Sequence, residues 1–154
     1  MKEMNDSTRV DELELWRSFA QTLRAVQKLL DSRLRPMGIG YQEFKVIGEL
    51  VTSGRTSMAK LAERIMFTQA GVTYLIDRLE EQGYVVRVRS SEDRRIIFIE
   101  TTDRGKKVFE EGLKVIRETT RELFQNLTHE ELASMYNSLM KIQENTERAA
   151  ATRQ

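Results

Sequence analysis

The stretch SMAKLAERIMFTQAGVTYLIDRLEEQGYVVRVRSSEDRRIIFIETTDRG, residues 57–105, decides the fold of this 154-residue chain. Apolar residues recur at helical spacing over residues 57–65 and again over residues 68–82. Met66 and Phe67 separate these two segments. The pattern predicts two short helices joined by a tight turn.

Two strand-like runs follow the second predicted helix. Gly83 ends that helix, and residues 84–89 and 96–100 are rich in β-branched side chains, with SSEDRR at 90–95 between them. Two helices joined by a short turn and followed by a basic hairpin are the layout of a winged helix-turn-helix. In that motif one helix enters a DNA major groove and the hairpin tip reaches the neighbouring groove or backbone. We predict a mainly α fold with a small β-hairpin wing over about residues 41–101.

The start of the second motif helix carries the predicted DNA-reading surface. Thr68 is a predicted N-cap, and Val72, Leu75, Ile76 and Leu79 form the inward stripe. Small and hydrogen-bonding residues are left on the outer face, from which helix-turn-helix proteins reach base edges. The start of the first motif helix offers a hydroxyl or backbone amide to a phosphate. The predicted contacts from the two helices are Ser57, Met58, Thr68, Gln69, Ala70, Thr73 and Tyr74.

Long amphipathic helices flank this motif at about residues 11–35 and 103–148. Within the second range, Thr128 and Glu131 match a capping box. Each flanking range carries more apolar surface than one neighbour in a small domain requires, so we expect these helices to form a two-fold dimer. Such a dimer would place two recognition helices about one DNA turn, ~34 Å, apart on a pseudo-palindromic site. The predicted interface residues are Leu13, Trp16, Ile116, Leu123, Leu127 and Leu139.

Composition limits the classes of function. The formal net charge is only +1, so an argument for DNA depends on local charge, and four arginines against two acidic residues make the hairpin net +2. The chain has no cysteine and one histidine, His129, which excludes thiol chemistry and disfavours a transition-metal site. We find no glycine-rich phosphate loop and no nucleophile–base pair, and we interpret Glu80 and Glu81 as ordinary helix surface. We therefore expect no enzymatic activity, no metal and no cofactor.

The ends of the chain complete the predicted organisation. Residues 1–10 are polar and charged, which predicts a loose arm without a signal peptide. Residues 11–148 form one predicted unit, and residues 149–154 a frayed tail. No apolar run approaches the ~18 residues needed to span a bilayer. We expect a cytoplasmic protein.

Several motifs resemble the MarR family of winged-helix transcription factors. They lie at Leu61-Ala62, over residues 68–85, at Asp93-Arg94-Arg95, and in the Thr-x-x-Gly motif of residues 102–105. The spacing between the last two is specific to the family, whereas a helix-turn-helix pattern alone is not. Thr101 stands where the family usually has leucine, which concerns packing and not DNA contact. The resemblance extends over nearly the whole chain.

The resemblance implies a homodimer that binds duplex DNA near its own promoter, usually as a repressor. Release is often triggered by a small aromatic or phenolic ligand. By similarity, Arg95 enters the minor groove while Asp93 holds its guanidinium, and Arg89 and Arg94 meet phosphates or the wing base. Arginine suits this role because a planar, pre-oriented cation fits a narrow negative groove. The predicted wing contacts are Arg89, Ser90, Asp93, Arg94 and Arg95.

The wing and the candidate ligand site each admit a second interpretation. Taken alone, the wing is also consistent with a solvated turn whose Asp–Arg pair contributes under ~1 kcal/mol. Arg24 and Tyr41 match family positions that line a ligand cleft and would suit an aromatic carboxylate, but a solvated arginine and a packing tyrosine fit equally well. For the whole protein, the alternative function is a winged-helix protein–protein module that binds no DNA. The basic wing and the polar helix face disfavour it.

Overall fold

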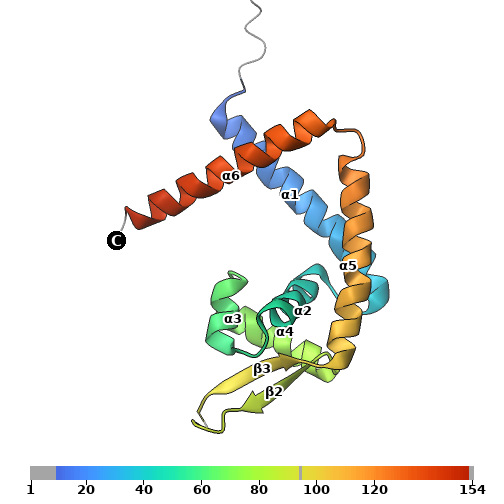
Figure 1. Cartoon of the computed structure of the whole chain (residues 1–154), viewed down its shortest axis with the longest axis vertical. Helices are drawn as coiled ribbons and strands as arrows, with labels where there is room; N and C mark the ends of the chain where they lie inside the picture. Colours follow the sequence, from blue (N-terminus) through green and yellow to red (C-terminus); the bar gives the residue numbers. More distant parts are fainter. Residues whose placement is uncertain (1–9, 94, 153–154) are drawn as a thin grey trace, which may run out of the picture. The chain divides into compact units, whose positions relative to one another are not determined.

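A computed structural model of the protein describes residues 10–93 and 95–152. It is mostly helical with one small antiparallel sheet (Figure 1), which confirms the predicted mainly α class. Arg94 of the predicted wing lies outside the described residues, as do residues 1–9 of the predicted arm and residues 153–154. The chain divides into two compact units, the first ending at Ile116.

The helices of the first unit lie where the apolar periodicity predicts them. The two motif helices begin and end within one residue of the predicted ranges. A short 3-10 helix, Arg35–Met37, ends the long first helix at Pro36, as expected for a residue that cannot continue it. In chain order the α-helices are α1 (Glu12–Leu34), α2 (Tyr41–Ser53), α3 (Met58–Arg64), α4 (Gln69–Glu81) and the start of α5 (Asp103–Phe124).

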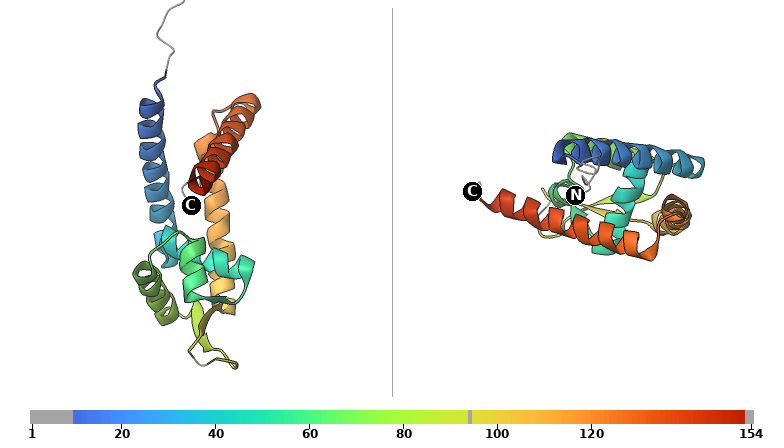
Figure 2. Two further views of the ribbon diagram at one scale, coloured as in Figure 1. Left: turned by 90° about the vertical axis from the view of Figure 1, so that its left-hand side faces the viewer. Right: turned by 90° about the horizontal axis from the view of Figure 1, so that it is seen from above.

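The sheet has the strand order β1-β3-β2, and both pairings are antiparallel. The hairpin of β2 (Val85–Arg89) and β3 (Ile97–Thr101) confirms the predicted wing. The sequence did not predict β1 (Thr56–Ser57), because a two-residue strand is too short for an alternating pattern. The β2–β3 hairpin extends beyond the helices of the first unit (Figure 1 and Figure 2).

Hydroxyl caps fix the helix starts that the sequence predicts. Ser57, Thr68, Thr102 and Thr128 each accept a hydrogen bond from the backbone amide three residues further on, at 3.4, 3.1, 3.0 and 3.2 Å. Such a cap typically stabilises a helix by about 1 kcal/mol. The Thr102 hydroxyl also donates to the Gly83 carbonyl at 2.7 Å, which ties the start of α5 to the end of α4.

The core of the first unit collects the inward faces of α2, α3 and α4. Each fully buried aliphatic side chain of this kind stabilises the fold by about 1.5–3 kcal/mol. Phe44 of α2 stacks on Phe109 of α5 with ring centroids 5.0 Å apart, which joins α5 to the same core. The predicted inward stripe of α4 is confirmed as buried in its entirety: Val72, Leu75, Ile76 and Leu79.

The second unit contains the end of α5 and helix α6 (His129–Ala151). The predicted capping box of Thr128 and Glu131 is present at the start of α6. The helix continues past Arg148, so residues 149–151 are helical where the sequence predicted a frayed tail. No residue of α6 is buried in the single chain. Within the described ranges, no helix combines the length and the apolar character needed to cross a membrane.

Gly105 of the Thr-x-x-Gly motif allows a test of how closely the start of α5 packs against Tyr84 and Thr101. A Cβ atom at Gly105 would overlap the Tyr84 carbonyl oxygen and the Thr101 hydroxyl, and the carbonyl belongs to backbone that cannot swing away. We expect Gly105→Ala to lower the free energy of unfolding by about 1–3 kcal/mol, measured by urea denaturation. Lys107→Ala, at an exposed position of the same helix, is the control. Equal stability of the two variants would contradict the close approach at Gly105.

Candidate nucleic-acid interface

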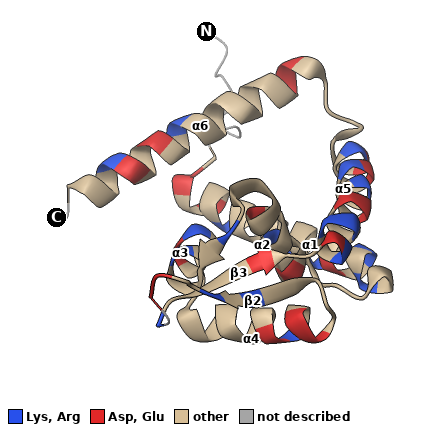
Figure 3. Cartoon of the chain, turned by 60° about the horizontal axis from the view of Figure 1, so that its bottom comes forward, with Lys and Arg blue, Asp and Glu red and all other residues tan. Residues whose placement is uncertain are grey.

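The N-terminal half of α4 presents an uncharged polar face to solvent. Gln69, Ala70, Thr73 and Tyr74 are all exposed, with Tyr74 at 62%. The Thr73 hydroxyl donates to the Gln69 carbonyl at 2.9 Å and keeps its acceptor capacity. Amide, methyl and hydroxyl groups are the ones that read adenine, the thymine methyl and other base edges in a major groove. Figure 3 shows the charged residues of α4 confined to its other half.

The start of α3 offers backbone groups rather than side chains. The Ser57 oxygen is used as the helix cap, and the half-buried side chain of Met58 packs against the core. The backbone amide of Met58 is therefore the group that remains for a phosphate. Lys60 is exposed one turn further on, and no carboxylate pairs with it within the described residues. The sequence pattern did not single out Lys60, although its place in the first turn of the predicted helix over residues 57–65 could have indicated it.

The turn between α3 and α4 holds Met66 in the left-handed region, with φ at 56°. This conformation is uncommon for a residue other than glycine. The Met66 side chain is 91% exposed, so packing does not explain the residue type. The Phe67 amide donates to the Ala62 carbonyl at 3.0 Å, which closes the turn and brings Thr68 into position to cap α4.

The wing tip carries a pre-oriented arginine. The Arg95 side chain donates from Nε and Nη2 to the two carboxylate oxygens of Asp93, each at 3.1 Å, and the Arg95 amide donates to Asp93 Oδ1 at 3.0 Å. The hydrogen bonds from the Arg95 side chain, and then from its amide, lower the pKa of Asp93 below its ordinary value. The Ser90 oxygen accepts hydrogen bonds from the amides of Glu92 and Asp93 at 3.2 and 3.3 Å. The Arg95 side chain remains 91% exposed, so it is oriented without being covered.

The base of the wing is joined to α4 by Arg87. Its guanidinium bonds Asp77 Oδ1 at 2.5 Å and pairs with Glu80, and its amide donates to Glu80 Oε1 at 3.2 Å. Burial opposes the charged form, but the bonds to Asp77 and Glu80 outweigh it and raise the pKa of Arg87. This corrects one expectation, because Glu80 is not ordinary helix surface. Arg87, one of the four arginines counted in the hairpin charge, is paired with carboxylates of α4. Arg89, two residues further along β2, has no carboxylate partner among the described residues.

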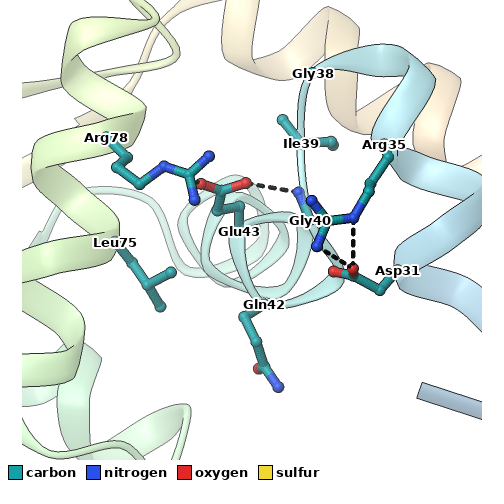
Figure 4. Close-up of a pocket in the computed structure, with 9 residues that line it drawn as sticks. All are labelled: Asp31, Arg35, Gly38, Ile39, Gly40, Gln42, Glu43, Leu75 and Arg78. Atoms are coloured by element: carbon teal, nitrogen blue, oxygen red, sulfur yellow. Dashed lines mark hydrogen bonds and ion pairs between the residues drawn. The ribbon is translucent and has the colours of Figure 1, made fainter. Parts of the chain in front are cut away.

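The opposite flank of α4 is joined to α2 by a second ion pair (Figure 4). Arg78 Nε lies 3.2 Å from Glu43 Oε1, and Glu43 is only 2% exposed. The other carboxylate oxygen of Glu43 accepts a hydrogen bond from the Gly40 amide at 2.6 Å. This pair borders a cavity of 360 Å³ whose lining also includes Asp31 and Arg35, themselves 3.0 Å apart. Helix α4 is thus held by charge pairs on both flanks.

The two candidate ligand residues do not line this cavity. Arg24 is exposed on α1, and Tyr41 is half-buried against the core at the start of α2. The Tyr41 amide donates to Asp31 Oδ1 at 3.0 Å, so Tyr41 lies beside Asp31. Arg24 precedes Asp31 by two helical turns, about 10 Å along α1.

The predicted interface residues fall into two groups. Leu13 and Trp16 are exposed on α1 in the first unit. Ile116 is half-buried against the core of that unit, so part of its apolar surface is already covered. Exposed positions in the second unit are Leu123, Leu127 and Leu139. Among the residues that the structure describes, no group of three or more His, Cys, Asp or Glu side chains could hold a metal ion.

Comparison with known proteins identifies the same architecture. The sequence profile of the MarR family matches residues 37–96. The structure of the transcriptional regulator BldR from Sulfolobus solfataricus is 31% identical with a TM-score of 0.73, and the match covers 90% of this chain and 99% of BldR. A mutant MarR from E. coli complexed with operator DNA is 25% identical with a TM-score of 0.76, covering 83% and 92% of the two chains. The HTH-type transcriptional regulator YkoM of Bacillus subtilis is 30% identical over 93 residues, which are 60% of each chain.

The helix-turn-helix, the three-stranded sheet and the exposed basic hairpin define a winged-helix DNA-binding protein. Its relatives are transcriptional regulators and not enzymes. The chain belongs to the MarR family of transcriptional regulators.

The Asp93–Arg95 geometry predicts a pH response of the wing. Because the folded-state pKa of Asp93 is lowered, the pair is intact at neutral pH and is lost as the pH falls through that lowered value. We expect the carboxyl of Asp93, followed by carbon-13 NMR, to titrate below its ordinary range and to return to it in Arg95→Gln. Arg89→Gln is the charge-matched control and should leave the titration of Asp93 low. An ordinary pKa for Asp93 in the wild-type protein would show that the pair does not form in solution.

Proposed function

We propose that the protein is a homodimer that binds a pseudo-palindromic site in double-stranded DNA and represses transcription. The observation that carries this proposal is the position of the exposed, uncharged face of α4 and the pre-oriented Arg95 on one folded unit. A transcriptional regulator must reach chromosomal DNA, so the proposal includes a cytoplasmic location.

Each part of the surface has a proposed role. The start of α4 enters the major groove, where Gln69, Ala70, Thr73 and Tyr74 meet base edges. Arg95, oriented by Asp93, enters the adjacent minor groove, whose negative potential favours an arginine. Contacts to phosphates, which position the protein without reading sequence, come from Ser57, Met58, Thr68, Arg89, Ser90 and Arg94.

The proposed dimer accounts for apolar surface that a single chain leaves uncovered. Trp16, Phe19 and Leu23 follow one another at helical spacing on α1, and all three are exposed. In the second unit, the 23-residue helix α6 has no buried residue although Leu139 and Ile142 are apolar. Contiguous apolar surface of this kind marks an interaction site, and a second copy is the occupant that a two-fold regulator requires.

The proposal includes release from DNA by a small aromatic or phenolic effector. A guanidinium such as that of Arg24 suits a carboxylate or phenolate, and the ring of Tyr41 suits an aromatic partner. Arg24→Ala, which removes the guanidinium, and Tyr41→Leu, which removes the ring but keeps an apolar side chain for packing, separate this role from solvated and packing roles. A variant that binds DNA normally but no longer responds to a phenolic compound would support the effector site.

The proposal is tested by a gel-shift titration on the upstream region of the protein's own gene. Scrambled DNA of equal length is run in parallel, at two salt concentrations. We expect tight binding to the natural sequence only, weakening with salt because phosphate contacts release counterions. Equal binding to both DNAs would contradict sequence-specific regulation. A folded dimer that binds neither would favour the protein–protein module.

We predict that Arg95 contributes to the affinity for the natural upstream DNA. Removing a side chain that fills a minor groove should weaken binding, so we expect Arg95→Ala to cost about 1–3 kcal/mol in the same titration. Lys107→Ala removes a positive charge outside the proposed surface and serves as the control. If Arg95→Ala and Lys107→Ala bind the natural DNA equally well, Arg95 has no groove contact.

Substitutions on α6 test the proposed dimer. Leu139→Glu places a charge on the exposed apolar surface and should shift the dimer toward monomer in sedimentation velocity, because burying an unpaired charge is costly. Asn137→Glu adds the same charge two positions away, on the opposite side of the helix, and should leave the dimer intact. Identical sedimentation of both variants and the wild type would remove Leu139 from the interface.

A further inference from the structure

The outer half of the wing is a two-stranded ribbon. Strand β1 pairs with β3 only at Ile99 and Phe98, while the β2–β3 ladder continues to the pair of Arg89 with Ile97. A two-stranded hairpin is marginally stable when it stands alone in water. The direction of the wing beyond Phe98 therefore depends on how firmly the part of the hairpin before Phe98 is held to the rest of the unit.

Arg87, in the middle of β2, holds the hairpin opposite Ile99, one residue before the end of the three-stranded part of the sheet. Alternate residues of a strand share one face, so Val85, Arg87 and Arg89 point to the same side. Val85 is buried in the core, Arg87 is 27% exposed and bonds α4, and Arg89 is exposed near the tip. Arg87 is thus the outermost residue on this face of β2 that holds the strand to the rest of the unit.

The partners of Arg87 lie one turn apart on the recognition helix. Asp77 and Glu80 are separated by three residues, so their side chains project from the same side of α4. The planar guanidinium of arginine bonds both at once, with Nη2 on Asp77 and Nη1 on Glu80. The Arg87 amide bonds Glu80 as well, so backbone and side chain of β2 are both held.

The helix that receives these bonds is itself fixed. Its inward stripe is buried, and Arg78 on its other flank pairs with the buried Glu43 of α2. A displacement of the wing would therefore have to break the Arg87 contacts, because α4 does not move with it.

We propose that Arg87 is a positioning residue: its bonds to Asp77 and Glu80 fix the direction of the wing relative to α4, and so set the separation between the groove contact of Arg95 and that of the recognition helix. This inference rests on the proposed function, because it assigns Arg87 a role within the DNA-binding surface. Arg87 itself touches no DNA, since both ends of its guanidinium are bonded to carboxylates. Its neighbour Arg89, without such a partner, is free to meet a phosphate.

Pre-orientation of the wing matters because a DNA-binding surface with two separate contacts gains affinity only if both reach their grooves together. A wing that sampled many directions would lose that freedom on binding, and the ordering cost would appear as weaker affinity.

The first test needs no DNA. The chain has no cysteine, so spin labels can be attached at Ser91→Cys on the wing tip and Gln69→Cys at the start of α4. Labelled protein is mixed with excess unlabelled protein, so that distances are measured within one subunit. We expect a narrow distance distribution in the parent and a broadened one in Arg87→Ala and Glu80→Gln. Unchanged widths in both variants would overturn the proposal.

Glu81→Gln is the matched control. It removes the same charge at the adjacent position, and Glu81, unlike Glu80, has no bond to Arg87. Its distance distribution should match the parent. Urea denaturation of all variants shows whether a broadened distance distribution comes from the wing or from a destabilised core. For Glu80→Gln we expect a broadened distribution with an unchanged free energy of unfolding.

The second test measures affinity for the natural upstream DNA. Glu80→Gln and Glu81→Gln change the net charge equally, so non-specific attraction to DNA is matched between them. We expect Glu80→Gln to bind about tenfold more weakly than Glu81→Gln. The double variant Arg87→Glu with Glu80→Arg should recover part of the loss seen in Arg87→Glu, because the swapped charges can pair. Equal affinity of Glu80→Gln and Glu81→Gln would overturn the positioning role.

The two tests also separate this inference from the proposed function. If the wild-type protein bound no specific DNA, the proposed function would fail, yet the distance measurement would still decide whether Arg87 orients the wing. If wild-type binding were specific and Glu80→Gln matched its control, the positioning role alone would fail.

Discussion

The structure depends on the burial of one side of α4. Val72, Leu75, Ile76 and Leu79 are all buried, and together they hold the helix against α2 and α3. At about 1.5–3 kcal/mol for each side chain, this stripe contributes an amount comparable to the whole stability of a small domain. Because the inward stripe fixes the rotation of the helix, it also determines which residues face outward at its start. Fold stability and the recognition surface therefore have the same origin in the sequence.

Charge pairs add directed contacts to the apolar burial of α4. Arg78 joins α4 to the buried Glu43 on one flank, and Arg87 joins β2 to Asp77 and Glu80 on the other. At the wing tip the same chemistry orients Arg95 through Asp93 without covering it. These three pairs differ in exposure and in role: the first anchors a helix, the second joins two elements, and the third pre-orients a side chain for a groove. Formal net charge, which is close to zero, conceals this arrangement.

The sequence predicted what depends on local pattern. Apolar spacing located both motif helices to within one residue, and all four hydroxyl caps lie where Ser or Thr precedes a periodic segment. Local pattern could not predict contacts between segments that are far apart in the sequence. Glu80 and Glu81 are indistinguishable as helix surface until β2 folds back and brings Arg87 to one of them. Ile116 and Leu123 share an apolar stripe on α5, but only the structure shows that Ile116 is already packed against a core. Strand β1 was missed because two residues are too few for an alternating pattern, and because their partners Phe98 and Ile99 lie far along the chain.

In the proposed complex, α4 and the wing contact neighbouring grooves of the same DNA half-site. A combined footprint on the natural upstream DNA addresses it most directly, with dimethyl sulfate reporting guanines in the major groove and hydroxyl radicals reporting sugars along the minor groove. We expect a protected major-groove segment with an adjacent protected minor-groove segment, repeated with inverted symmetry ~34 Å away, which is one helical turn. Protection of the minor groove or backbone alone, with the major groove left open, would contradict it.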